Sequence, residues 1–193
     1  PGIDNIEELI GIGSTEDVHI VVQVDWAEGL PKESAWRSSD LTEHQRWYIH
    51  SGTHEVLETL DEAGGNKESL LDFIQWGMTQ YPADRFAVVI WNHGGGWYFG
   101  EDDTPDDQYY MTLTKIEQAV QGGLAAAQVE KIDLLIFYAC LMASYETMVH
   151  LAPYAEYLLA SEEVTYGFKF QALVDHPIFR TDCRSPGHRR IHM

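Results

Sequence analysis

Basic residues are scarce in this chain. Lysine and arginine together number 12, against 31 aspartates and glutamates, so the formal net charge is −19. Such a chain repels the phosphate backbone of nucleic acids and the surface of an anionic membrane, and we expect neither as a partner. The same charge is compatible with high solubility, a basic substrate or a salty habitat.

Long apolar runs and cysteines are also few. The sequence contains no run of 18 or more apolar residues, so we expect no transmembrane helix, and no stretch has the pattern of a signal peptide. Two cysteines, Cys140 and Cys183, are too few for a disulfide framework. Apolar residues make up 45% of the 193 residues, which is enough for one globular domain with a substantial core.

Several catalytic motifs are missing. The chain has no G-x-S-x-G nucleophile elbow, which argues against an esterase, although such enzymes also use His-Gly-Gly-Gly. It has no H-E-x-x-H zinc motif. His44, His50 and His54 lie near one another in the sequence, but their spacing fits no standard metal site, and we expect them on the surface. Residues 100–107 are rich in carboxylates but lack EF-hand spacing, so a solvated acidic loop is favoured over a calcium site.

The segments that remain alternate between strand and helix patterns. Short β-branched runs predict strands over residues 18–25, 46–50, 85–92, 131–139 and 155–161. Amphipathic or capped segments predict helices over residues 66–81, 110–128 and 144–155. This alternation requires crossover connections, so we expect an α/β fold with a mostly parallel sheet flanked by helices.

Two predicted strands end in residues with catalytic chemistry. The run "FAVVIW" is followed by Asn92 and His93, and the run "LLIFYA" is followed by Cys140, 47 positions after His93. Ligands and reactive residues of open parallel sheets collect beyond the carboxyl ends of strands, and a right-handed crossover would bring both ends to one rim. A histidine beside a cysteine is the minimal set for thiol nucleophilic catalysis. Taken separately, a turn histidine and a buried packing cysteine are the ordinary interpretations.

The three glycines after His93 fit the same chemistry. A tetrahedral intermediate needs backbone N–H donors for its oxyanion, and glycine allows the main chain to approach a substrate closely. Gly94 and Cys140 are the candidate donors.

The blocks "VVIWNHGGGW" and "IDLLIFYACLMASYETMVHLAPYAEYLLASEE" resemble the clostripain family of cysteine peptidases. The resemblance extends from about Asp17 to about Phe168. It implies the caspase-like three-layer sandwich shared with gingipains and legumain, a peptide or protein substrate, His93 as the catalytic histidine and Cys140 as the nucleophile. The family has an acid at the position of Glu146, which we interpret as structural. No cofactor is required, calcium is associated with some relatives, and the resemblance suggests secretion or a cell-envelope location.

The chain departs from the family pattern at the position that the resemblance links to specificity. Where the family has an aspartate two residues before the nucleophile, this chain has Tyr138. Tyrosine carries no negative charge at neutral pH, so we expect a weakened preference for arginine and lysine. Ser161, Glu162 and Glu163 follow a predicted strand and could line the substrate site from another wall.

The two ends also depart from the pattern. The family's first core strand should precede "IEELI", so we expect a peptidase domain over residues 1–179 that lacks its first strand. Residues 180–193 carry four arginines and one aspartate, and predict a basic, non-native tail. Because of these departures, a degenerate or fragmentary domain that binds peptides or partners without cutting is the alternative to an enzyme.

Overall fold

The described part of the chain is organised around a parallel β-sheet. A computed structural model describes residues 2–25, 44–61, 64–100, 110–165, 169–175 and 191–192. The sheet order is β1-β10-β5-β8-β9, and every neighbouring pair is parallel. The strands are β1 (Val18–His19), β10 (Ile191–His192), β5 (Arg85–Trp91), β8 (Ile132–Tyr138) and β9 (Ala155–Leu159). The expected α/β class with a parallel sheet is therefore confirmed.

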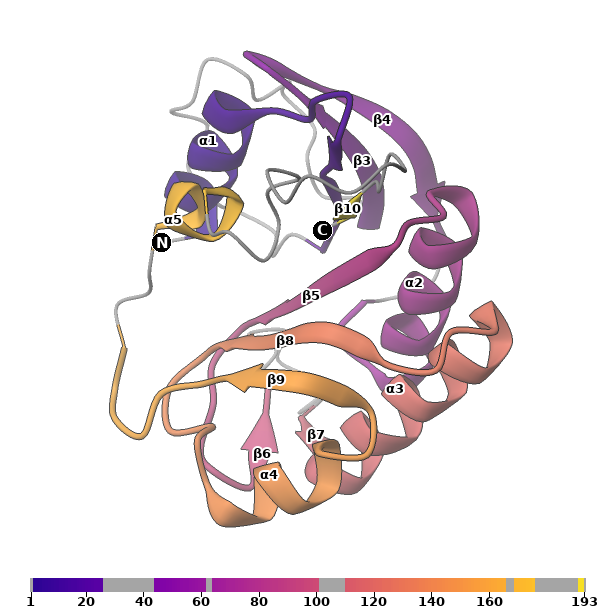
Figure 1. Cartoon of the computed structure of the whole chain (residues 1–193). Coiled ribbons are helices and arrows are strands. Elements are labelled where there is room, and N and C mark those ends of the chain that lie inside the picture. Colours follow the sequence, from indigo (N-terminus) through magenta and orange to yellow (C-terminus); the bar gives the residue numbers. More distant parts are fainter. Residues whose placement is uncertain are drawn as a thin grey trace.

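Helices cover the sheet from two directions. They are α1 (Gly2–Ile12), α2 (Lys67–Gln80), α3 (Leu113–Ala127), α4 (Tyr145–Leu151) and α5 (Phe170–Val174). Helices α2 and α3 lie side by side, and α1 lies against α5 away from that pair (Figure 1). None of the helices in the described part of the chain is long and apolar enough to cross a membrane.

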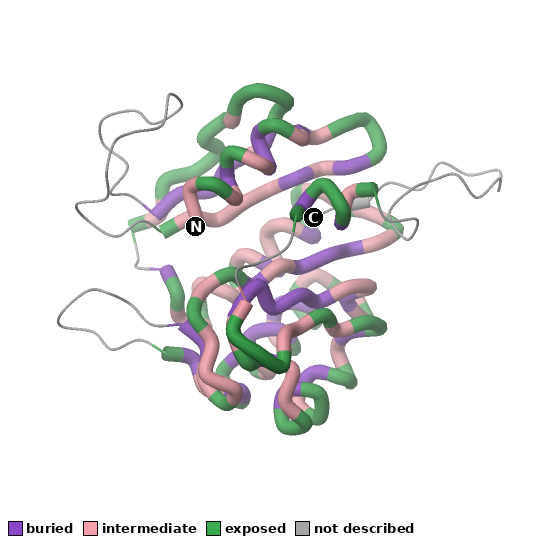
Figure 2. Tube along the Cα trace, turned by 90° about the vertical axis from the view of Figure 1, so that its left-hand side faces the viewer, coloured by how far each residue is buried: buried purple, intermediate pink, exposed green. Residues whose placement is uncertain are grey.

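Strand β8 contributes to the core on both of its faces. Leu135 and Phe137 pack with α2 and α3, whereas Ile136 and Tyr138 pack with α1 and α5. Burial therefore runs along the central strands in Figure 2. A strand covered on both faces has no polar face to present, which explains the continuous apolar run in its sequence.

One predicted strand is divided between the parallel sheet and a second, antiparallel sheet. Its order is β2 (Val21–Val24), β3 (His44–His50) and β4 (Thr53–Leu60). Residues 18–25 do not form one strand as expected, because the N–H of Ile20 donates to Ser14 Oγ (2.8 Å) between β1 and β2. The prediction that residues 46–50 form half of a hairpin is confirmed by their pairing with β4.

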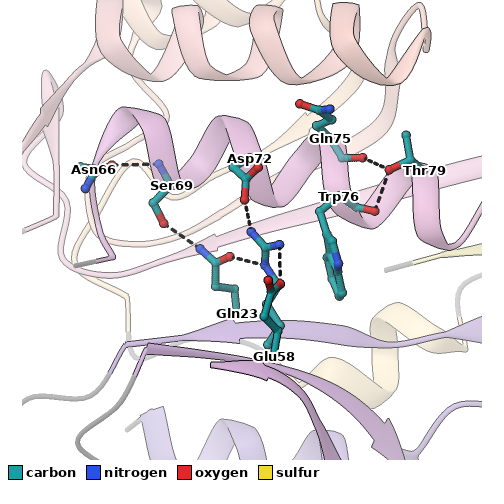
Figure 3. A network of polar contacts seen from close by, with 9 residues as sticks. Gln23, Glu58, Asn66, Ser69, Asp72, Gln75, Trp76 and Thr79 are labelled. Atoms are coloured by element: carbon teal, nitrogen blue, oxygen red, sulfur yellow. Dashed lines mark hydrogen bonds and ion pairs between the residues drawn. The ribbon is translucent and has the colours of Figure 1, made fainter. Parts of the chain in front are cut away.

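Arg46 joins this second sheet to α2. Figure 3 shows its partners Gln23, Glu58 and Asp72. Its side chain is 4% exposed, and it donates to Gln23 Oε1 (2.9 Å), Glu58 Oε2 (3.0 Å) and Asp72. Its guanidinium carbon also lies 4.7 Å from the ring centre of Trp76. Hydrogen bonds to both sheet and helix offset the cost of burying this charge, so Arg46 fixes α2 against β2, β3 and β4.

Other boundaries differ from the sequence predictions. Helix α3 begins at Leu113 and not at Tyr110, because Met111–Thr112 forms β7, which pairs with β6 (Tyr98–Phe99). Helix α2 agrees with expectation, since Asn66 caps it through a bond to the N–H of Ser69 (2.8 Å). The expected surface position is wrong for His44, which is 7% exposed. Burial also lowers the pKa of His54, and this ring stacks on Trp47 at 4.1 Å.

The proposed division at residue 179 falls largely outside the described residues. Only residues 191–192 of the expected tail are described, and they form β10 between β1 and β5. The tail and the missing first strand therefore stay predictions.

Candidate active site

The pairing of β5 with β8 brings His93 and Cys140 to neighbouring positions. Every residue pair in this register is separated by 47 positions in the sequence, and the last pair is Trp91 opposite Tyr138. His93 and Cys140 have the same separation, and each follows its strand end by two residues. The two strand tips therefore reach the same rim of the sheet, as the sequence predicted.

Both side chains are accessible at this rim. His93 is exposed and Cys140 is partly buried. The thiol of Cys140 lies 3.8 Å from the carbonyl oxygen of Thr165. A reactive group needs this combination of access and a polar partner.

The glycine segment after His93 folds back on itself. The N–H of Gly95 donates to Tyr98 O (3.0 Å), and the N–H of Gly100 donates to His93 O (2.9 Å). The N–H of His93 itself donates to Asn92 Oδ1 (2.6 Å). These bonds give residues 93–100 a defined shape, which we call the histidine loop.

The histidine loop presses against the cysteine at Gly94. A Cβ at this position would lie 2.3 Å from the carbonyl oxygen of Cys140 and 2.9 Å from Met142 Cγ. Only glycine fits so close to the backbone of the candidate nucleophile. The packing fits a role for Gly94 beside Cys140, and the oxyanion hole built from their N–H groups stays a prediction.

A tight turn, residues 140–144, carries Cys140, and we call it the cysteine turn. Leu141 has a φ of 61°, which is uncommon for a residue with a side chain. Its N–H donates to Glu163 O (3.2 Å), and the N–H of Ala143 donates to Ser161 O (3.0 Å). A network of main-chain bonds thus fixes the strained residue directly after the cysteine.

The same bonds locate three of the expected substrate-binding residues. Ser161 and Glu163 lie beside the cysteine turn, where Ser161 Oγ also donates to Glu163 O (2.9 Å). Glu162 lies between them and is exposed. The structure brings this segment close to Cys140, and binding of substrate by the three side chains stays a prediction.

Tyr138 is placed deeper than its expected role suggested. It is 9% exposed, and its ring stacks on Phe170 at 5.6 Å with an interplanar angle of 6°. Its hydroxyl accepts a hydrogen bond from Asn5 Nδ2 (3.0 Å). Asn5 Oδ1 in turn accepts from Trp91 Nε1 (3.1 Å). One face of the ring is therefore occupied by protein.

Sequence reasoning missed Asn5, Trp91 and Phe170 as neighbours of the candidate site. Asn5 and Phe170 come from the two ends of the described chain, and no local pattern connects them to Tyr138. Trp91 could have been found, because it occupies the last position of β5 and faces the position of Tyr138 in the parallel register.

The structure shows no metal centre in the residues it describes. No group of three or more histidine, cysteine, aspartate or glutamate side chains is arranged to hold an ion within those ranges. The acidic loop lies mostly outside them, so the calcium expectation stays open. Glu146, exposed in the first turn of α4, is placed where a carboxylate favours a helix start.

Comparisons with known proteins agree with this arrangement. A sequence model of the clostripain family matches residues 3–178. Clostripain of Hathewaya histolytica is 30% identical over 203 residues, covering 90% of this chain and 38% of the relative. The chain therefore spans well under half of that relative's length.

Solved structures show the same fold. A secreted C11 cysteine protease from Bacteroides thetaiotaomicron, in complex with an irreversible peptide inhibitor, gives a TM-score of 0.68 at 22% identity, covering 90% of this chain and 48% of that one. An inactive zymogen C11 protease from Parabacteroides distasonis gives 0.62 at 22% identity, covering 88% and 46%. With the family match over most of the chain, these likenesses lead to one assignment: this chain belongs to the clostripain family of cysteine proteases.

Proposed function

We propose that this protein is a cysteine endopeptidase that cleaves peptide bonds with Cys140 and His93. The observation that carries the proposal is the shared separation of 47 residues, which aligns the two strand tips. The close packing of Gly94 on the carbonyl of Cys140 supports it, because it fixes the histidine loop on the nucleophile. Relationship to cysteine proteases raises the expectation further.

The proposed reaction uses groups of this chain alone. The sulfur of Cys140, as thiolate, attacks the scissile carbonyl and forms a tetrahedral intermediate. The N–H groups of Gly94 and Cys140 stabilise the oxyanion. His93 gives a proton to the leaving amine and then activates the water that releases the acyl group. This chemistry needs no redox or organic cofactor.

The substrate is a peptide or protein whose preferred side chain is not strictly basic. Tyr138 occupies the position of the family's aspartate, and its ring is stacked on Phe170. No carboxylate is therefore available at this position to pair with a guanidinium. Glu162 and Glu163, both exposed beside the cysteine turn, are the side chains that could attract a basic residue instead.

The detailed architecture and the location of the protein are proposed by analogy with the family. We propose that the parallel sheet and the helices on its two faces form a caspase-like three-layer sandwich. We also propose export, as for the relative from Bacteroides thetaiotaomicron that is described as secreted.

A second candidate is a domain that binds peptides without cleaving them. The buried position of Tyr138, held by Asn5, favours it, because the family's charged pocket residue is replaced by a core side chain. The intact pair of His93 and Cys140 favours the enzyme.

Replacing the two reactive residues tests the proposal. Cys140→Ala and His93→Ala should each abolish peptide cleavage while the circular dichroism spectrum and urea midpoint change little, because neither residue belongs to the buried core. Retained turnover in Cys140→Ala would exclude Cys140 as nucleophile, and absence of turnover in the wild type would favour the binding domain.

A further inference from the structure

Two hydroxyl groups connect the histidine loop to the element that follows the cysteine turn. Ser144 Oγ donates to the carbonyl oxygen of Gly96 (3.1 Å), and Thr147 Oγ1 donates to the same oxygen (3.5 Å). The two hydroxyls also lie 2.9 Å from each other. Gly96 is three residues after His93, and Ser144 is four residues after Cys140. The contact thus joins the two segments that carry the proposed catalytic pair.

We propose that Ser144 and Thr147 form a hydroxyl clasp that holds His93 in register with Cys140, so that both act as positioning residues for peptide cleavage. The inference rests on the proposed function, because it gives the clasp a role in that reaction. The alternative is a purely structural role, in which the same hydroxyls only stabilise the start of α4.

Either of the two hydroxyls can be the donor to the Gly96 carbonyl. When Ser144 donates to Gly96 O, Thr147 can donate to Ser144 Oγ; when Thr147 donates to Gly96 O, Ser144 can donate to Thr147 Oγ1. In both arrangements the Gly96 carbonyl receives one hydroxyl proton. The clasp therefore tolerates rotation of either group.

Burial gives these bonds their strength. Thr147 is 0% exposed, and Ser144 is only partly exposed. A hydrogen bond shielded from water has no competing solvent partner, and removing one member leaves a buried polar atom unsatisfied. Gly96 has a φ of 84°, so its carbonyl is held in an orientation that few residues other than glycine adopt.

Ser144 has a second role that the test must separate. Its Oγ accepts the N–H of Thr147 (3.1 Å) and caps the start of α4. Ser144→Asp keeps a strong helix cap. An ionised carboxylate has no proton to donate, however, and it accepts the Thr147 hydroxyl proton more strongly than a carbonyl does, so the Gly96 carbonyl would lose both donors. Ser144→Thr keeps both the cap and the proton.

Peptide cleavage by these two variants gives the primary readout. We expect kcat of Ser144→Asp to fall by about ten- to a hundredfold with little change in KM, as for a catalytic group displaced by up to about 1 Å. Ser144→Thr should stay close to the wild type. Asn66→Ala, which removes the cap of α2, is the matched control: it should lower the urea midpoint and leave kcat unchanged.

Thr147→Val tests the redundancy of the clasp. It keeps the shape of the side chain and removes its hydroxyl, so Ser144 can still donate to Gly96 O. We expect a small loss of kcat in this variant and, in Ser144→Ala/Thr147→Val, a loss that exceeds the product of the two single effects. If the loss of kcat in the double variant equals the product of the two single losses, the hydroxyls act independently, and this result would contradict the clasp.

A second measurement separates this inference from the proposed function. Iodoacetamide alkylation of Cys140, located by peptide mass spectrometry, needs no peptide substrate. The clasp predicts slower alkylation in Ser144→Asp and unchanged alkylation in Ser144→Thr. If the wild type does not cleave peptides, the proposed function fails while the alkylation rates still decide the clasp. Equal kcat and equal alkylation in Ser144→Asp and wild type would overturn it.

Discussion

Adding a single methyl group at Gly94 should disturb the proposed active site more than the rest of the fold. In Gly94→Ala, the new Cβ would lie 2.3 Å from the carbonyl oxygen of Cys140, where ordinary contact begins at 3.4 Å. The same Cβ would lie 2.9 Å from Met142 Cγ and 3.1 Å from Ala139 Cβ, so a small shift away from the carbonyl does not relieve the contact. Gly94 does not have a positive φ, so the effect comes from crowding and not from backbone strain.

The size of the effect follows from the displacement required. The histidine loop or the cysteine turn must move by about 1 Å, and a shift of that size can lower a catalytic rate by about a hundredfold. Overpacking of this kind costs about 1–3 kcal/mol of unfolding free energy. Because the N–H of residue 94 is retained, loss of the donor itself cannot explain a lower rate.

The assay compares Gly94→Ala with Gly11→Ala. A Cβ at Gly11 meets nothing within 4 Å, and this residue lies in the last turn of α1. Alanine there should leave kcat/KM unchanged and raise stability by up to about 1 kcal/mol. Urea denaturation and peptide cleavage of both variants decide the matter. A Gly94→Ala protein with wild-type stability and wild-type turnover would refute the close packing of the two loops.

Two further outcomes follow from the structure. In a peptide library at moderate ionic strength, cleavage after leucine, phenylalanine or tyrosine should rival cleavage after arginine, because Tyr138 offers no negative charge. A preference for arginine of about three orders of magnitude, worth roughly 4 kcal/mol, would contradict this and reveal a compensating acid such as Glu162. Arg46→Met should lower the unfolding free energy by about 1–3 kcal/mol, because charged hydrogen bonds to Gln23, Glu58 and Asp72 are lost, and an unchanged urea midpoint would show that this network contributes nothing.

Local signals were sufficient where each element carries its own pattern. The range 66–81 predicted α2 closely, because Asn66 caps the helix and Pro82 follows its end in the sequence. Continuous apolar runs predicted β5 and β8. The meeting of His93 and Cys140 at one rim followed from two strand ends and one crossover. These inferences need only short-range chemistry and a handedness rule.

Other features depend on partners distant in the sequence. Strand β4 is mostly exposed and gives no clear alternation, so its pairing with β3 defines it. The break between β1 and β2 depends on Ser14, and the surroundings of Tyr138 depend on Asn5 and Phe170. Tertiary context decides such positions, and a single sequence does not record it.

Labelling of Cys140 by a peptidyl chloromethyl ketone tests the central claim most directly. The reagent delivers an electrophile to a thiolate only when a peptide-binding site and an activating histidine are both in place. We predict a covalent adduct on Cys140 that forms faster than the adduct on Cys183 by at least about tenfold, and that slows by a similar factor in His93→Ala. Equal labelling of the two cysteines, or labelling of Cys140 that does not depend on His93, would contradict the assignment of a Cys140–His93 peptidase.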